Sequence, residues 1–225
     1  MCHSNTSKGL LTALGLAGFA VISYFITQGA VLPLDTSVQE AVFSMRSQWI
    51  TALLIPLTYS GNWQTVAVVC GLLLLLPPTR KHYGVPMTVS ALLSVSFYET
   101  LKFIFQRPRP DFVNFLIPQG GFSFPSGHAL TGLVVWGTAL LLIRRYSRLP
   151  RSGYEEKYDF PHVTNGTAVS IITILLCAYI LLMGFSRVYL GVHYPTDILA
   201  SWCLGLCMLT ALESSYFCDI LEENH

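Results

Sequence analysis

Long apolar runs separated by short polar segments constrain the fold of this chain more than any other feature. Six runs follow one another, at residues 10–25, 63–76, 84–105, 126–144, 167–185 and 195–212. Hydrophobic residues make up 52% of the 225 residues and charged residues 11%, which is too apolar for an ordinary soluble domain. A membrane-spanning helix needs about 20 such residues. Because the runs lack the alternation of barrel strands, we predict an all-α protein, a six-transmembrane helical bundle that forms a single domain over residues 1–225.

Two shorter segments lie between the first and second runs. Residues 33–49 mix charged and apolar side chains, which predicts a short amphipathic helix at the membrane interface with Asp35 as its N-cap. Residues 50–59 predict a further short helix. After the second run, Pro77-Pro78 cannot continue a helix, so we expect residues 80–82 to form a brief loop. The expected bundle therefore has short interfacial helices between its first two spans.

The charges between the runs predict an orientation. Six spans place both termini on the same side of the membrane. If that side is cytoplasmic, the inner segments hold eight of the 13 Lys and Arg residues and the outer segments hold five. The positive-inside rule then favours a multi-pass protein of the cell membrane, plasma or inner, with both termini cytoplasmic. The net charge of +1 argues against a nucleic-acid partner, and no obligate protein partner is evident.

Ionisable residues cluster at the ends of four runs. Lys102 ends the third run, the fourth begins at Ser126, Arg187 follows the fifth, and His193 precedes the sixth. Because consecutive spans are antiparallel, these groups must meet at one membrane face, the outer face in the predicted orientation. Ionisable residues at membrane depth are costly and usually functional, so we expect one site there.

Three of the converging residues are cations that suit a phosphate group. Lys102 supplies a point charge, whereas Arg109 and Arg187 supply planar, bidentate donors. The helix start at Ser126 and Gly127 adds free backbone N–H groups and the positive end of the helix dipole. Together these groups predict a phosphate cradle.

Two histidines complete the chemistry of phosphoryl transfer. His193 and Asp197 are four residues apart at a helix start, so the carboxylate can hold one imidazole nitrogen and leave the other nucleophilic. We therefore predict His193 as the nucleophile, Asp197 as its partner and His128 as the acid that protonates the leaving oxygen.

We predict neither a metal nor another cofactor. The sequence has no Walker-type glycine loop and no carboxylate cluster suited to magnesium. Its six cysteines lie mostly inside apolar runs, so we expect small buried residues rather than ligands or disulfides.

The motifs carry a specific resemblance. Lys102, six residues and Arg109-Pro110 form the first; Pro125-Ser126-Gly127-His128 is the second; Ser186-Arg187, five residues, His193, three residues and Asp197 form the third. This set, within residues 102–197, resembles the complete three-part signature of the type 2 phosphatidic acid phosphatase superfamily. Those metal-independent lipid phosphatases share a histidine phosphatase core with the vanadium haloperoxidases.

The resemblance implies the same roles as the residue chemistry. Lys102, Arg109 and Arg187 would bind phosphate with Ser126 and the Gly127 amide. His193 would form a phosphohistidine, with His128 as the acid and Asp197 as the partner of His193. The resemblance also implies a site on the extracytoplasmic side, in agreement with the charge count.

Three features stay open at the level of sequence. Glu99 is either a structural partner of Lys102 or part of the pocket wall. Arg107 holds a lipid headgroup, holds a second phosphate or faces water. The aromatic loop at residues 112–124 is expected to be an interfacial anchor, with a gate for the lipid tail as the alternative.

The sequence thus predicts a membrane phosphatase for a lipid phosphate or pyrophosphate whose chain stays in the bilayer. Undecaprenyl pyrophosphate, phosphatidylglycerol phosphate and phosphatidic acid are all compatible substrates. A lipid phosphotransferase would share every site residue. A vanadate-dependent haloperoxidase is disfavoured by the six apolar runs, and a non-catalytic receptor or transporter by the intact nucleophile and acid.

Overall fold

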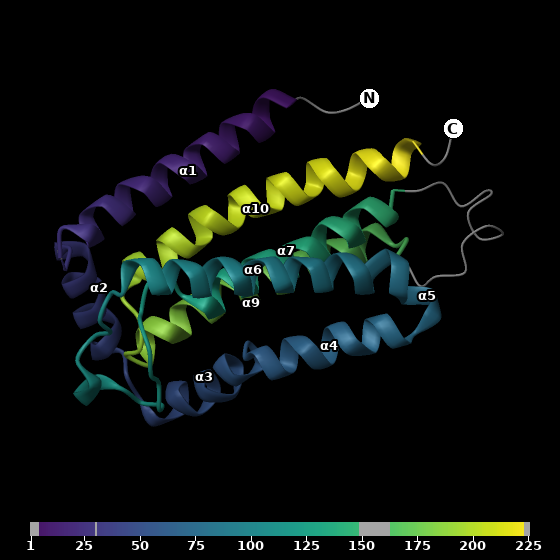
Figure 1. Ribbon diagram of the computed structural model, residues 1–225. Coiled ribbons are helices and arrows are strands. Elements are labelled where there is room, and N and C mark those ends of the chain that lie inside the picture. The colour runs from purple at the N-terminus through teal and green to yellow at the C-terminus, as the bar shows by residue number, and fades with distance from the viewer. Residues whose placement is uncertain (1–4, 30, 149–162, 223–225) are drawn as a thin grey trace.

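The computed structural model describes residues 5–29, 31–148 and 163–222, and these form an all-helical bundle without strands (Figure 1). This confirms the predicted fold class. The helices are α1 (Asn5–Thr27), α2 (Pro33–Ser44), α3 (Gln48–Ser60), α4 (Trp63–Leu75), α5 (Pro77–Thr79), α6 (Val85–Phe105), α7 (Gly127–Tyr146), α9 (Gly166–Tyr189) and α10 (Pro195–Glu222). A π-helical turn (Arg80–Gly84) joins α5 to α6, and a 3₁₀ turn (Phe112–Asn114) interrupts the segment before α7.

Five helical stretches of the described chain are long and apolar enough to cross a membrane. They are α1, the continuous stretch Pro77–Phe105, α7, α9 and the part of α10 up to Ser214. The second predicted span is present as α4, but its 13 residues extend only about 20 Å, less than the ~30 Å of a bilayer core. The first turn of α1 and the last turn of α10 lie at the same end of the bundle (Figure 1).

The prediction of a loop at residues 80–82 is wrong, because the chain continues there as helix. Pro77 occupies the first position of α5, where a missing N–H costs nothing. The Thr79 hydroxyl donates to the carbonyl of Leu73 at 2.9 Å, and Arg80 Nε donates to that of Leu74 at 2.7 Å. These side chains satisfy the free carbonyls at the end of α4.

Helix α7 is the most enclosed helix and packs against α6, α9 and α10. Leu130 and Val134 pack against Leu204 of α10. Toward α6, a buried hydrogen bond of 3.2 Å runs from the Ser94 hydroxyl to that of Thr131. The first turn of α7, where His128 lies, is therefore held rigidly.

The cysteines follow the prediction in part. Cys70 and Cys207 are buried free thiols and Cys203 is half-buried, whereas Cys177 is exposed on α9. Cys2 and the side chain of Cys218 lie outside the part of the chain that the structure describes, as do residues 149–162 of the predicted cytoplasmic connector.

Asp35 is not the N-cap of α2, which is a correction to the sequence prediction. Leu32 occupies the N-cap position, and Asp35 lies in the first turn, fully buried. The aromatic loop also differs from the expected anchor at one residue: Phe124 is fully buried, and its ring stacks on Phe19 at 5.9 Å between centroids. Phe122 keeps 39% of its surface exposed.

Candidate active site

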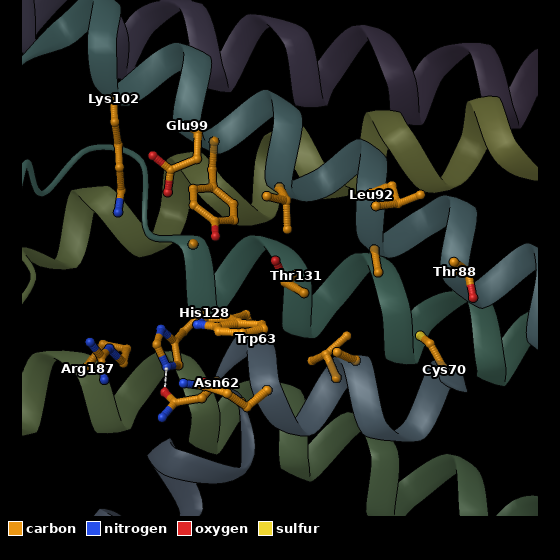
Figure 2. Close-up of a pocket in the computed structure, with 18 of the residues that line it drawn as sticks. Asn62, Trp63, Cys70, Thr88, Leu92, Glu99, Lys102, His128, Thr131 and Arg187 are labelled. Atoms are coloured by element: carbon orange, nitrogen blue, oxygen red, sulfur yellow. Dashed lines mark hydrogen bonds between the residues drawn. The ribbon is translucent and has the colours of Figure 1, made fainter. Parts of the chain in front are cut away.

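A cavity of about 810 Å³ opens where α6 and α9 end and α7 begins. It is lined by most of the predicted site residues, namely Lys102, Arg109, Gly127, His128, Arg187 and His193. Glu99 also lines it. Figure 2 shows Lys102 from α6 and Arg187 from α9 at the same end of the pocket as His128. The convergence expected from connectivity is therefore present.

Arg109 is fixed by the loop that carries it. Its Nε donates to the carbonyls of Gly120 and Gly121 at 3.0 Å, and Nη1 donates to that of Val192 at 2.6 Å. Burial lowers the pKa of Arg109 to about 10, an effect that Asp197 partly opposes. The guanidinium therefore stays positive at neutral pH.

Arg187 is held by two residues that the sequence did not single out. Its Nη1 donates to the hydroxyl of Thr58 in α3 at 2.7 Å, and Nη2 donates to Oε1 of Gln119 in the loop at 2.6 Å. Only 1% of Arg187 is exposed. Neither partner carries charge or belongs to a motif, so only the docking of α3 and the loop reveals them.

Two donors of this arginine pair have no partner in the described structure. Arg109 Nη2 and Arg187 Nε are both buried and make no hydrogen bond. Buried polar groups are nearly always satisfied, so each exception needs an explanation. Both arginines line the cavity, so a bound oxyanion is one explanation for their unpartnered donors.

The hydrogen bonds of His193 define its tautomer. Arg109 Nη1 lies 3.2 Å from His193 Nε2, and because arginine only donates, Nε2 carries a lone pair. The proton then lies on Nδ1, which faces Asp197 Oδ2 at 3.3 Å. Burial, followed by the charges of Arg109, Arg187 and Lys102, holds the pKa of His193 well below its ordinary value. The imidazole is therefore a neutral base with its lone pair at the cavity.

Ser126 is the N-cap of α7 and, unlike the other residues predicted to bind phosphate, does not line the cavity. Its hydroxyl accepts from the Ala129 N–H at 3.5 Å, and its own N–H donates to Ser201 at 2.9 Å. Gly127 lines the cavity against the Tyr98 ring, which a Cβ would approach to 3.2 Å. The absence of a side chain at Gly127 thus allows the close approach of α6 and α7.

Asn62 is a further residue that sequence reasoning missed. Its Oδ1 lies 2.9 Å from His128 Nε2, a contact drawn in Figure 2. An amide oxygen only accepts, so His128 Nε2 carries a proton in this contact. The Ser60-Gly61-Asn62 break between α3 and α4 was the only signal in the sequence.

None of the three roles that the sequence left open for Arg107 fits its position in the structure. Arg107 is 6% exposed and lies outside the cavity wall, so it neither faces water nor reaches a cavity ligand. It pairs instead with Asp197 and Asp35. Glu99 lines the cavity, and within the described residues no ion pair joins it to Lys102, whose Nζ lies 5.2 Å from the centroid of the Tyr98 ring.

The rest of the cavity is an apolar arm between α4 and α6. Its wall is made by Val66, Ala67, Cys70, Gly71 and Leu74 of α4 and by Thr88, Ala91, Leu92 and Val95 of α6. From Lys102 to Thr88 the arm follows α6 for about 21 Å at 1.5 Å per residue. Figure 2 shows Cys70, Thr88 and Leu92 at the end away from the cations. A site of this shape accepts an anion attached to a long apolar chain.

Comparison with known proteins agrees with this geometry. Residues 83–217 match the sequence profile of the PAP2 superfamily. The chain is 26% identical over 197 residues to phosphatidylglycerophosphatase B of Bacillus subtilis, covering 84% of this chain and 87% of that protein. It is 30% identical over 161 residues to undecaprenyl-diphosphatase of Sulfolobus acidocaldarius, covering 69% and 66%. The crystal structure of a transmembrane PAP2 type phosphatidylglycerolphosphate phosphatase from B. subtilis superimposes with a TM-score of 0.66 at 21% identity, covering 89% and 94%.

Proposed function

Because this chain belongs to the PAP2 superfamily, we propose that it dephosphorylates a lipid phosphate or pyrophosphate through a phosphohistidine intermediate at the extracytoplasmic face. It is a multi-pass membrane enzyme of the lipid phosphatase class. One observation carries the proposal for this chain. The same cavity is lined by two arginines that each have one buried donor without a partner, and it continues as an apolar arm about 21 Å long.

The cationic end suits the phosphate. Its oxygens would accept from Arg109 Nη2 and Arg187 Nε, with Lys102 as an additional charge. The backbone N–H groups at the start of α7, at Gly127 and His128, complete the cradle. Electrostatic stabilisation of this kind usually supplies the largest part of phosphoryl-transfer catalysis.

The chemical steps begin with neutral His193 and require His128 in its imidazolium form. His193 Nε2 attacks phosphorus as Arg109 shifts from Nε2 to the phosphate, and the bond from phosphorus to the leaving oxygen breaks. The His128 imidazolium protonates that oxygen, which releases the dephosphorylated lipid and leaves His128 neutral. Asp197 stabilises the imidazolium through Nδ1–H. A water activated by His128 then attacks the phosphohistidine, which releases phosphate and restores both histidines.

Phosphate release from purified protein in detergent micelles tests the proposal. The names of the two relatives make phosphatidylglycerol phosphate and undecaprenyl pyrophosphate the first substrates, with phosphatidic acid beside them. We expect release that resists EDTA, competitive inhibition by vanadate, and an acid-labile phosphoenzyme that His193→Ala abolishes. Transfer of label to a second lipid would instead show a phosphotransferase. Full activity of His193→Ala would refute the proposed nucleophile.

A further inference from the structure

We propose that Asp35 is a positioning residue that, in one buried network with Arg107, sets the net charge around Asp197 beside His193. The inference rests on the proposed function, because it takes His193 as the nucleophile. Asp35 lies on α2, outside the residues that match the family profile, and no sequence motif includes it.

The three side chains form one buried network. Arg107 Nη1 donates to Asp197 Oδ1 at 2.5 Å, and its Nη2 donates to Asp35 Oδ2 at 2.7 Å. Both carboxylates are fully buried, and the Arg107 side chain is 5% exposed. The other oxygen of Asp197 faces His193 Nδ1. A single guanidinium thus links Asp35 to the carboxylate that contacts the nucleophile.

Asp35 also fixes the first turn of α10. The Thr196 N–H donates to Asp35 Oδ1 and the Thr196 hydroxyl donates to Oδ2, both at 2.9 Å. Thr196 directly precedes Asp197, so these bonds hold Asp197 in register with His193. The Arg107 side chain also donates to the Thr196 hydroxyl at 2.9 Å.

The charges of the network explain why two carboxylates share one arginine. Arg107 paired with Asp197 alone would neutralise the carboxylate that His193 needs. With Asp35 on its other side, the three groups keep a net charge of −1 next to His193. The network is buried, so salt and water screen it little. Asp197 can therefore stabilise positive charge on the imidazole as Nε2 attacks.

Stability alone does not account for this arrangement. Removing two or three charged groups from water costs several kcal/mol each, and well-packed apolar residues often serve stability as well or better. The network contacts the one carboxylate that orients the nucleophile. A role in setting the charge on that carboxylate accounts for both the burial and the position of Asp35.

Three variants separate charge from structure: Asp35→Asn, Arg107→Gln and the double variant. The net charge beside His193 becomes zero in the first, −2 in the second and −1 again in the double variant. Glu40→Gln, which removes a charge from an exposed position on the same helix, is the matched control. The variants leave unchanged the other charged and titratable groups around His193, namely Lys102 of α6, Arg109 of the loop, His128 of α7, Arg187 of α9, and Tyr194 and Asp197 at the start of α10.

The readout is the acidic limb of the profile of kcat/KM against pH, that is, the pH range over which activity falls as the pH is lowered. The position of this limb reports the pKa of His193 in the free enzyme. Less negative charge makes His193 less basic, so Asp35→Asn moves the limb about 1 unit to lower pH and lowers kcat about tenfold. Arg107→Gln moves the limb to higher pH by a similar amount. The double variant and Glu40→Gln keep the limb of the unmodified protein.

Competitive inhibition by inorganic phosphate shows whether the cradle is intact, because the donors of the cradle are not altered. We expect the phosphate inhibition constant to stay within about twofold in every variant, whereas a merely structural role would weaken phosphate binding in step with kcat. Arg107→Gln and the double variant differ at residue 35 alone, and coincident limbs in that pair overturn the inference. If variants with Asp35→Asn do not fold, Asp35→Glu, which keeps the charge, should keep the limb of the unmodified protein, and a shifted limb in it overturns the inference. Absence of phosphate release by the unmodified protein, or full activity of His193→Ala, overturns the proposed function instead.

Discussion

Filling the apolar arm at Gly71 should separate lipid substrates by chain length. Gly71 lines the arm on α4, and a Cβ added there meets nothing within 4 Å, so a leucine would project into the cavity. Gly71 lies nine residues beyond Asn62, or about 13 Å along α4, and the arm continues for about 4.5 Å to Leu74. Gly71→Leu therefore excludes the last three or four methylene groups of an extended chain, at about 0.8 kcal/mol each.

The expected cost is about 3 kcal/mol, or roughly a 100-fold fall in kcat/KM for a long-chain phosphatidic acid. A short-chain analogue that ends before Gly71 should lose less than about threefold. Replacing glycine in a helix also favours the helix by about 0.5–1 kcal/mol, so lost stability would not explain the change.

Phosphate release from both lipids in the same micelles gives the comparison, and Gly71→Ala is the control that favours the helix without filling the arm. Equal losses on the two lipids, or none on the long one, would refute a chain site between α4 and α6.

Three further predictions concern the cationic end. Arg187→Lys keeps the charge but removes both the planar donors that bind Thr58 and Gln119 and the unpartnered Nε. The binding free energy of vanadate should therefore weaken by about 2 kcal/mol, which raises its inhibition constant roughly 30-fold. Asn62→Ala removes the acceptor that orients His128 Nε2, so kcat should fall about tenfold with KM nearly unchanged in steady-state assays, and a change in KM alone would contradict it. Because burial and nearby cations hold the pKa of His193 below 6.5, the neutral nucleophile persists as pH falls through 6.5; the acidic limb of kcat/KM, which reports protonation of His193, should therefore lie below pH 6.5, as a pH profile checks.

The sequence predicted the elements whose signal is local. Each apolar run became a helix, and the ends of α6, α7 and α9 followed the polar residues that bound the runs. Connectivity then required Lys102, His128, Arg187 and His193 to meet, and all four line one cavity. The continuous helix after Pro77 was missed because its capping bonds come from side chains that reach back to α4.

The site residues that the sequence did not predict are brought into place by the docking of short elements. Thr58, Asn62 and Gln119 are ordinary polar residues on short elements, and only tertiary packing brings them to Arg187 and His128. Asp35 was interpreted as a cap because an acidic residue near a helix start usually has that local role. Its real partner, Arg107, is 72 residues away in the chain.

Hydrogen-bond satisfaction separates the two arginines proposed to bind phosphate from Arg107. Arg107 is buried between two carboxylates and leaves none of its donors among the unsatisfied atoms of the described chain. Arg187 is fully buried and Arg109 is half-buried; both line the cavity, and each keeps one buried donor without a partner. A buried unsatisfied donor costs about 1–3 kcal/mol, which a protein without a ligand has no reason to retain at two residues that line one cavity. This difference supports the proposal that the two motif arginines bind an anion, whereas Arg107 serves the carboxylate behind the proposed nucleophile.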